Sequence, residues 1–152
     1  MKNKLNKILD KLKLKRKNNK VFYSKVDNFS IGLKEILIIS KFINKRQKIF
    51  RICLHKNNLQ KIHEMIIVHL KSQTIGPLKQ KKKFISYHLL KGKLKIELLN
   101  KKRSKIFKLD EKNKKHLRIK CDLFRKVISL KPMTIFLEIC EGPFKDKDTI
   151  WK

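Results

Sequence analysis

The apolar residues of this chain repeat with a helical period in the first half and with a strand period in the second. Within residues 1–20, helical spacing predicts an amphipathic helix whose apolar face carries Leu5, Ile8, Leu9 and Leu12. A second helix is expected from Ser30, as its N-cap, to about Ile43. A third is expected after Asn58, with one apolar face formed by Leu59, Ile62, Ile66 and Leu70. Between these two helices, residues 50–55 are expected to form an irregular or short extended link.

After Ser72 the pattern changes to short apolar segments, several of which alternate apolar and polar residues. These segments are 84–90, 94–99, 106–109, 117–123, 126–130 and 134–140. Short strands that recur about every ten residues predict an all-β sandwich or barrel. We therefore predict a mainly β fold, with a small antiparallel barrel over residues 72–152 preceded by two to three helices. Residues 30–71 are expected to form its helical N-terminal part, and residues 1–20 a basic amphipathic extension.

The chain is strongly cationic, with 42 Lys and Arg against 12 Asp and Glu and a formal net charge of +30. Such a surface gains affinity for nucleic acids or anionic membranes by releasing counterions. However, 36 of the cations are Lys and six are Arg, whereas nucleic-acid surfaces favour the bidentate Arg. Lys, Asn and Ile have A/T-rich codons and the chain has no Ala, so the mutational bias of an A/T-rich genome explains the same composition. Both interpretations stay open for the overall charge. For the helix within residues 1–20, the alternatives are a basic helix that lies on anionic lipid or RNA and an extension whose short apolar stripe touches the domain.

The cysteines indicate a reduced protein. Cys53, Cys121 and Cys140 form no CxxC or other close pair, which is typical of free thiols in a cytoplasmic chain. No apolar run reaches the roughly 18–20 residues that cross a bilayer. The N-terminus lacks the apolar core and the cleavage site of a secretory signal. We therefore expect a cytoplasmic location.

A series of short motifs runs through the chain at a distinctive spacing. They are His55 in RICLH, Gly76-Pro77, LLKG at 89–92, VISLKP at 127–132, Glu138, and EGPF at 141–144. Together they resemble the cupins, and more narrowly the WbuC-type cupin-fold metalloproteins of bacterial O-antigen and lipopolysaccharide gene clusters. The resemblance extends from about Ser30 to Trp151. It implies a double-stranded β-helix, the jelly-roll barrel of the cupins, in a family whose members often dimerise.

The resemblance also implies a divalent metal held inside the barrel by histidines and a carboxylate. The positions that match those ligands carry Leu78, Gln80, Ile85 and Arg125 instead. Two aliphatic side chains, an amide and a guanidinium do not replace four ligands, and a protonated Arg repels a cation. We therefore predict no metal, no other cofactor and no metal-dependent catalysis.

The same four positions form the candidate pocket, because a guanidinium in the mouth of a barrel can clamp an anion. His55, His88 and Glu138 are candidates for further pocket or scaffold roles. We expect the protein to be non-catalytic or to bind a small anionic or sugar ligand, and we assign no catalytic residue. A homodimer is compatible with the resemblance. Two alternatives stay open. One is a Lys-rich protein that binds RNA or an anionic surface; the other is a metal-free sugar-modifying enzyme, whose adjacent Tyr87 and His88 would point to opposite strand faces.

Overall fold

The computed structural model describes residues 2–43, 47–81, 84–100 and 103–152, and in these ranges the chain is mainly β, as predicted. The helices are α1 (Lys2–Lys11) and α2 (Leu33–Phe42). The first strands are β1 (Leu14–Arg16), β2 (Val21–Ser24), β3 (Ile49–Cys53), β4 (Ile62–His69), β5 (Gln73–Gln80) and β6 (Phe84–Lys91). The later strands are β7 (Lys93–Leu99), β8 (Lys105–Asp110), β9 (His116–Lys120), β10 (Phe124–Ser129), β11 (Thr134–Glu141) and β12 (Thr149–Trp151).

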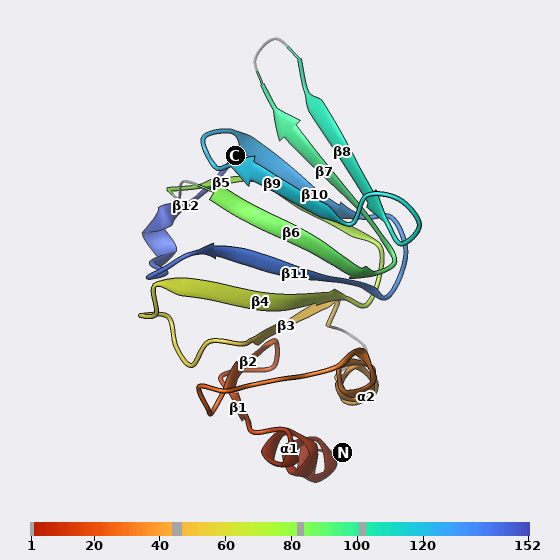
Figure 1. Cartoon of the computed structure of the whole chain (residues 1–152), viewed down its shortest axis with the longest axis vertical. Helices are drawn as coiled ribbons and strands as arrows, with labels where there is room; N and C mark the ends of the chain where they lie inside the picture. The colour runs from red at the N-terminus through yellow and green to blue at the C-terminus, as the bar shows by residue number, and fades with distance from the viewer. Residues whose placement is uncertain (1, 44–46, 82–83, 101–102) are drawn as a thin grey trace.

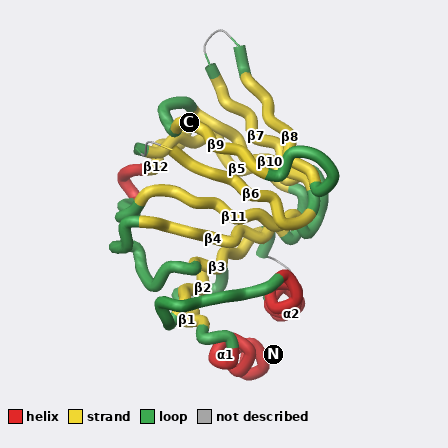
Figure 2. Tube along the Cα trace, in the orientation of Figure 1, coloured by secondary structure: helices red, strands yellow, loops and turns green. Residues whose placement is uncertain are grey.

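The strands form two facing sheets (Figure 1). One sheet has seven strands in the order β1-β2-β3-β4-β11-β6-β9, and the other has five in the order β12-β5-β10-β7-β8. All pairs are antiparallel except β2 with β3. In Figure 2 both helices lie at one end, beside β1, β2 and β3, and leave the rest of the sandwich uncovered. The candidate pocket residues therefore come from strands alone.

Two apolar clusters stabilise this arrangement. The inner cluster fills the space between the sheets and includes Ile85, Tyr87, Ile96 and Phe136. The outer cluster packs the helices on the first strands of the seven-stranded sheet; its members include Leu5 and Leu9 of α1, Ile36 and Ile39 of α2, and Val68 of β4. Leu5 and Leu9 are buried there and Ile8 and Leu12 pack against the same cluster, so the stripe predicted within residues 1–20 serves packing in this structure.

The third predicted helix is wrong: residues 62–69 form β4, which pairs with β3 and β11. The physical reason is burial on both faces. Ile66 and Val68 pack in the outer cluster while Ile67 packs in the inner one, so residues 65–68 form a continuous apolar run that does not alternate. The link predicted at residues 50–55 is largely β3 of the same sheet.

The second predicted helix exists but begins later than expected. Its N-cap is Gly32 rather than Ser30, and the Gly32 N–H donates a hydrogen bond to Glu35 Oε2 over 3.0 Å. The six strands predicted between residues 84 and 140 are all present as β6 to β11. Within the described ranges, no helix is both long and apolar enough to span a membrane.

Candidate ligand pocket

Four of the residues singled out in the sequence line one pocket between the sheets. Leu78 and Gln80 come from β5, Arg125 from β10 and Glu138 from β11, and the pocket has a volume of about 290 Å³. Leu78 lies directly opposite Arg125 in the β5–β10 register. The strand order therefore brings together positions that lie up to sixty residues apart in the chain. Phe144 and Trp151 contribute aromatic surface to the same pocket.

Arg125 is the dominant group of this pocket. It is only 2% exposed, and it is the largest fully buried side chain of the described chain. Its Nε donates to the hydroxyl of Tyr87 over 2.9 Å, and its Nη2 donates to Gln80 Oε1 over 2.8 Å. Its Nη1 is buried and has no hydrogen-bond partner among the described residues. A buried donor without a partner costs about 1–3 kcal/mol, more when the group is charged, so this nitrogen is a ready binding position for an acceptor.

The backbones of β5 and β10 approach each other closely at Gly76, beside Arg125. Gly76 has φ +100°, and a Cβ built on it would lie 2.4 Å from the carbonyl oxygen of Arg125. Only glycine tolerates both the backbone conformation and this contact. The glycine of the Gly76-Pro77 motif therefore positions β5 against β10 at the pocket.

The charge balance in the pocket favours an anion. Burial raises the pKa of the Tyr87 hydroxyl, so Tyr87 is a neutral hydrogen-bonding group at Arg125. Burial alone would lower the pKa of Arg125, but the attractions of Tyr87 and Glu138 outweigh it, and the net shift is upward. No carboxylate of the described residues forms an ion pair with Arg125 within 4.0 Å. The guanidinium thus keeps its charge without a bound counterion, although Glu138 lies on the same pocket wall.

A second, smaller chamber of about 170 Å³ adjoins the pocket and shares Arg51, Gln80, Glu138 and Phe144 with it. His55 and His63 line this chamber with their rings stacked, 4.1 Å between centroids. Burial and then the neighbouring His63 lower the pKa of His55 to about 4, so His55 is neutral at pH 7.

The histidine stack is anchored by backbone groups. The Glu64 N–H donates to His55 Nδ1 over 3.2 Å, and His63 Nε2 lies 3.2 Å from the carbonyl oxygen of Asn58. A Cβ on Gly142 would lie 1.8 Å from the carbonyl oxygen of Gln60 and 2.7 Å from the His63 ring. The glycine of the EGPF motif is therefore required by the close approach of the chain to this stack.

The chain resembles known proteins in its structure but not in its sequence. No family model matches the chain, and no curated protein matches it in sequence. Oxalate decarboxylase from Bacillus subtilis, solved at pH 4.6, matches with a TM-score of 0.50 and 17% identity, over 60% of this chain and 24% of that one. CapF, solved with the inhibitor 3-isopropenyl-tropolone, matches with a TM-score of 0.55 and 10% identity, over 72% and 33%. The chain has a cupin fold.

A third similar structure is closer to this chain in size. It is the conserved SPY1581 protein of unknown function from Streptococcus pyogenes, with a TM-score of 0.51 and 12% identity, over 66% of this chain and 80% of that one. By contrast, this chain spans about a quarter of the oxalate decarboxylase chain. At these identities the likeness concerns the cupin fold alone.

Two of the remaining predicted residues, Ile85 and His88, lie outside the pocket. Ile85 is fully buried in the inner cluster and does not line either chamber. His88 points to the outer face of β6, where its Nδ1 lies 2.6 Å from His116 Nδ1. Tyr87 and His88 therefore face opposite sides of the strand, as predicted, and do not serve one pocket. The sequence offered no signal for Tyr87 as the partner of Arg125, because a buried strand tyrosine has no distinctive pattern.

The residues of this cupin pocket do not fit a metal ion. Leu78 offers no lone pair, Gln80 already accepts a hydrogen bond from Arg125, and Arg125 presents only donors. Across the residues that the structure describes, no group of three or more His, Cys, Asp or Glu side chains is arranged to hold a metal.

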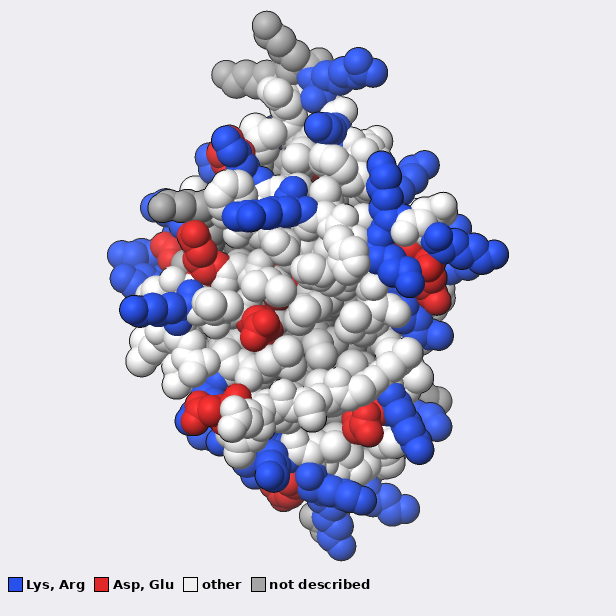
Figure 3. Space-filling view, in the orientation of Figure 1, with Lys and Arg blue, Asp and Glu red and all other residues white. Residues whose placement is uncertain are grey.

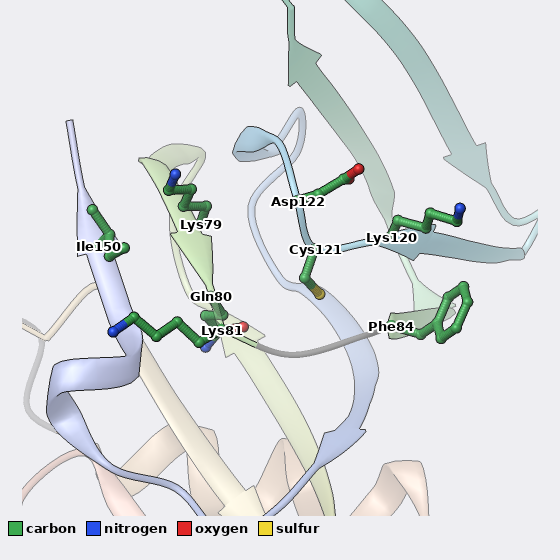
Figure 4. Close-up of a pocket in the computed structure, with 8 residues that line it drawn as sticks. All are labelled: Lys79, Gln80, Lys81, Phe84, Lys120, Cys121, Asp122 and Ile150. Carbon is green, nitrogen blue, oxygen red and sulfur yellow. The ribbon is translucent and has the colours of Figure 1, made fainter.

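An open hollow of about 530 Å³ lies next to the cupin pocket, at the end of β5 (Figure 4). Gln80 and Cys121 point into it, whereas the ammonium groups of Lys79, Lys81 and Lys120 point in different directions. Burial raises the pKa of the Cys121 thiol to about 11, so this thiol is protonated and unreactive at neutral pH. The hollow does not concentrate its charges on one point, whereas the buried pocket does.

Proposed function

We propose that this protein is a WbuC-type cupin without the family's metal, and that it binds a small anionic sugar derivative between its sheets. The observation that carries the proposal is the buried guanidinium of Arg125, whose Nη1 has no partner in the described chain. A guanidinium recognises a carboxylate with parallel N–H donors, and such charge-assisted bonds are about twice as strong as neutral ones. The carboxylate of the ligand would supply the missing acceptor at Nη1.

The size of the pocket sets the size of the ligand. A volume of about 290 Å³ corresponds to roughly ten water molecules at about 30 Å³ each, and hence to about ten to twelve non-hydrogen atoms. A hexuronic acid, with about 13 non-hydrogen atoms, is close to this size. Glu138 is available to accept hydrogen bonds from sugar hydroxyls, and Trp151 and Phe144 offer apolar faces to the ring.

The proposal describes a binding protein rather than an enzyme. Tyr87 is held neutral and already accepts the Arg125 Nε–H, and His88 lies on the opposite strand face. Neither is available as a general base in this pocket. The motifs that resemble WbuC-type cupins suggest that the ligand belongs to the acidic sugars of surface polysaccharide synthesis.

The direct test is calorimetric titration of the purified protein with glucuronate and, in parallel, with uncharged glucose. We expect binding of glucuronate and at least a tenfold weaker response to glucose, because only the acid carries the acceptor for Nη1. Arg125→Met should abolish glucuronate binding. Arg103→Met, which removes one positive charge from an exposed loop position, should leave it unchanged.

Two results would contradict the proposal. Equal binding of glucose and glucuronate, or unchanged glucuronate binding by Arg125→Met, would remove Arg125 from the site. Protein purified with zinc, iron, manganese and nickel supplied should contain only traces of them, and near-stoichiometric metal would refute the loss of the metal site.

A further inference from the structure

The smaller chamber beside the ligand pocket is formed in part by the N-terminal strands. β2 pairs in parallel with β3, and this register places Val21 beside Arg51. The same register places Tyr23 beside Cys53, and all four residues line the chamber of about 170 Å³. Residues 14–24 therefore do more than extend the seven-stranded sheet, because they form one wall of a cavity that adjoins the larger pocket.

Two cationic side chains converge on this chamber. Arg51 lines both the chamber and the larger pocket, whereas Lys17 lines only the chamber. The Lys17 ammonium lies 5.8 Å from the centre of the Tyr23 ring, so a cation–π contact holds it at the chamber wall. Burial raises the pKa of the Cys53 thiol to about 12, and the charges of Arg51 and then Lys17 act against this rise. Both cations therefore lie near the same buried thiol.

No carboxylate of the described residues forms an ion pair with either cation. Glu138 is the one carboxylate among the described residues that line the two cavities. Within 4.0 Å, neither Lys17 nor Arg51 has an acidic partner in the described chain. His55 adds no charge, because its pKa of about 4 leaves it neutral at pH 7. The chamber therefore carries an excess of positive charge.

The wall of the chamber is already ordered without a ligand. The hydroxyl of Tyr23 donates a hydrogen bond to Asn58 Oδ1, and the edge of the Tyr23 ring packs on His55 with 5.5 Å between the ring centroids. These contacts join β2 to the segment before β4. The Lys17 N–H donates to the carbonyl oxygen of Val21 over 2.9 Å, which fixes the turn that carries Lys17. Groups that are held in place before binding lose less entropy when a ligand arrives.

The high Lys content does not by itself explain this convergence. Figure 3 shows Lys and Arg side chains scattered over the face in view, with Asp and Glu among them, and such scattered charges attract any anion weakly. Arginine is scarce, with six in the chain, and two of the six, Arg51 and Arg125, line the same pocket. Arginine recognises phosphate and carboxylate groups with parallel N–H donors. The two adjoining cavities thus concentrate the residue type that binds anions most specifically.

We infer that the small chamber binds a phosphate group and that the ligand is a phosphorylated hexuronic acid. The phosphate would be the second anion of the ligand whose carboxylate, in the proposed function on which this assignment rests, binds Arg125. The chamber volume corresponds to roughly five or six water molecules at about 30 Å³ each, which is enough for one phosphate group. Lys17 and Arg51 would bind its oxygens. Glu138, on the wall that both cavities share, is left to accept hydrogen bonds from the sugar hydroxyls.

The first test is a phosphorus NMR titration with inorganic phosphate, in about 0.15 M NaCl so that scattered surface charges are screened. Arg125→Met serves as the background, so that phosphate cannot use the guanidinium of the larger pocket. Adding Lys17→Met should weaken phosphate binding at least about fivefold, because it removes a cation from the chamber. Adding Lys7→Met instead removes the same charge from an exposed position of α1 and should change binding less than about twofold.

The second test compares glucuronic acid 1-phosphate with glucuronate by calorimetric titration of the natural chain. We expect the 1-phosphate to bind at least about tenfold more tightly, because only this ligand places an anion in the chamber. Lys17→Met should remove this gain and leave the affinity for glucuronate within about twofold, since Lys17 does not line the larger pocket.

The outcomes separate the phosphate subsite from the proposed function. Glucuronate that binds at Arg125 without any gain from its 1-phosphate would overturn the phosphorylated ligand and leave the proposed function standing. Phosphate binding that depends on Lys17 in a protein that does not bind glucuronate would support the subsite and refute the proposed function. Phosphate binding that Lys17→Met and Lys7→Met weaken equally would reflect the overall charge alone and would overturn the subsite.

Discussion

His69 should make the fold sensitive to mild acid. Its side chain is fully buried on β4, with its ring 5.3 Å from the ring of Phe136. Neither ring nitrogen has a hydrogen-bond partner among the described residues. Burial lowers the pKa of His69 to about 4, because the charged imidazolium would have no polar contact there. A fall in pH from 7 to 5 should therefore destabilise the natural chain more than the His69→Leu variant.

The direction and the size of the stability change follow from the difference between the pKa of His69 in the folded chain and its pKa in the unfolded chain. The folded pKa of about 4 lies below the ordinary value of 6.5, so the unfolded chain binds this proton first as the pH falls. Stability is therefore retained above pH 6.5 and lost as the pH falls from 6.5 to 4. At 1.36 kcal/mol per pKa unit, the full loss is about 3 kcal/mol, of which about 2 kcal/mol develops between pH 7 and pH 5.

Urea unfolding followed by far-ultraviolet circular dichroism at pH 7, 6 and 5 would measure the effect. His69→Leu should lose about 2 kcal/mol less stability than the natural chain between pH 7 and pH 5. His55 acts in the same direction but is present in both proteins, so it cancels in the comparison. The exposed His116→Leu is the control and should follow the natural chain closely. Parallel pH profiles for His69→Leu and the natural chain would refute the reasoning.

Two further predictions concern the outer cluster and the thiols. Leu9→Ala should lower the free energy of unfolding by about 2–5 kcal/mol, because Leu9 is buried in the outer cluster. Lys7→Ala, at an exposed position of the same helix, should change the free energy of unfolding little. Equal urea midpoints for the two variants would mean that α1 does not pack on the domain. Burial raises the pKa of Cys53 to about 12 and that of Cys121 to about 11, so both thiols are protonated at pH 8. These two thiols should react with a disulfide reagent at least about a hundredfold more slowly in the native protein than after unfolding. Rapid reaction of Cys53 and Cys121 in the native protein would contradict this.

The strands were predictable where only one of their faces is apolar or where turn residues bound them. The segments 94–99 and 134–140 alternate or end at clear breaks, and they form β7 and β11 within a residue. The helix predicted over the segment 62–69 was wrong because both faces of residues 66–68 are buried, one by the helices and one by the opposite sheet. A continuous apolar run contains helical spacings by chance, so periodicity alone does not separate a doubly buried strand from a helix.

The pocket was predictable only in part. Resemblance to a family singled out Leu78, Gln80 and Arg125, and these three share one pocket. Ile85 has the inward strand parity of Tyr87 but is buried in the inner cluster and lines neither chamber, because strand parity does not determine which inward residues reach a pocket. The hydrogen bond from Arg125 to Tyr87 joins residues 38 positions apart on different sheets, so no local pattern could signal it.

The way in which Arg125 is held bears on whether the pocket is a remnant or a binding site. An uncompensated buried charge is costly, and replacing buried ionic groups by well-packed apolar residues is often neutral or stabilising. If the pocket no longer bound a ligand, an aliphatic side chain in place of Arg125 would be the more stable choice. Ile85 is such a side chain in the neighbouring inner cluster. Arg125 instead has two of its nitrogens aligned by Tyr87 and Gln80 and the third without a described partner. The prealigned guanidinium lowers the entropy that an incoming carboxylate must lose, and this is the arrangement that a preorganised anion site requires.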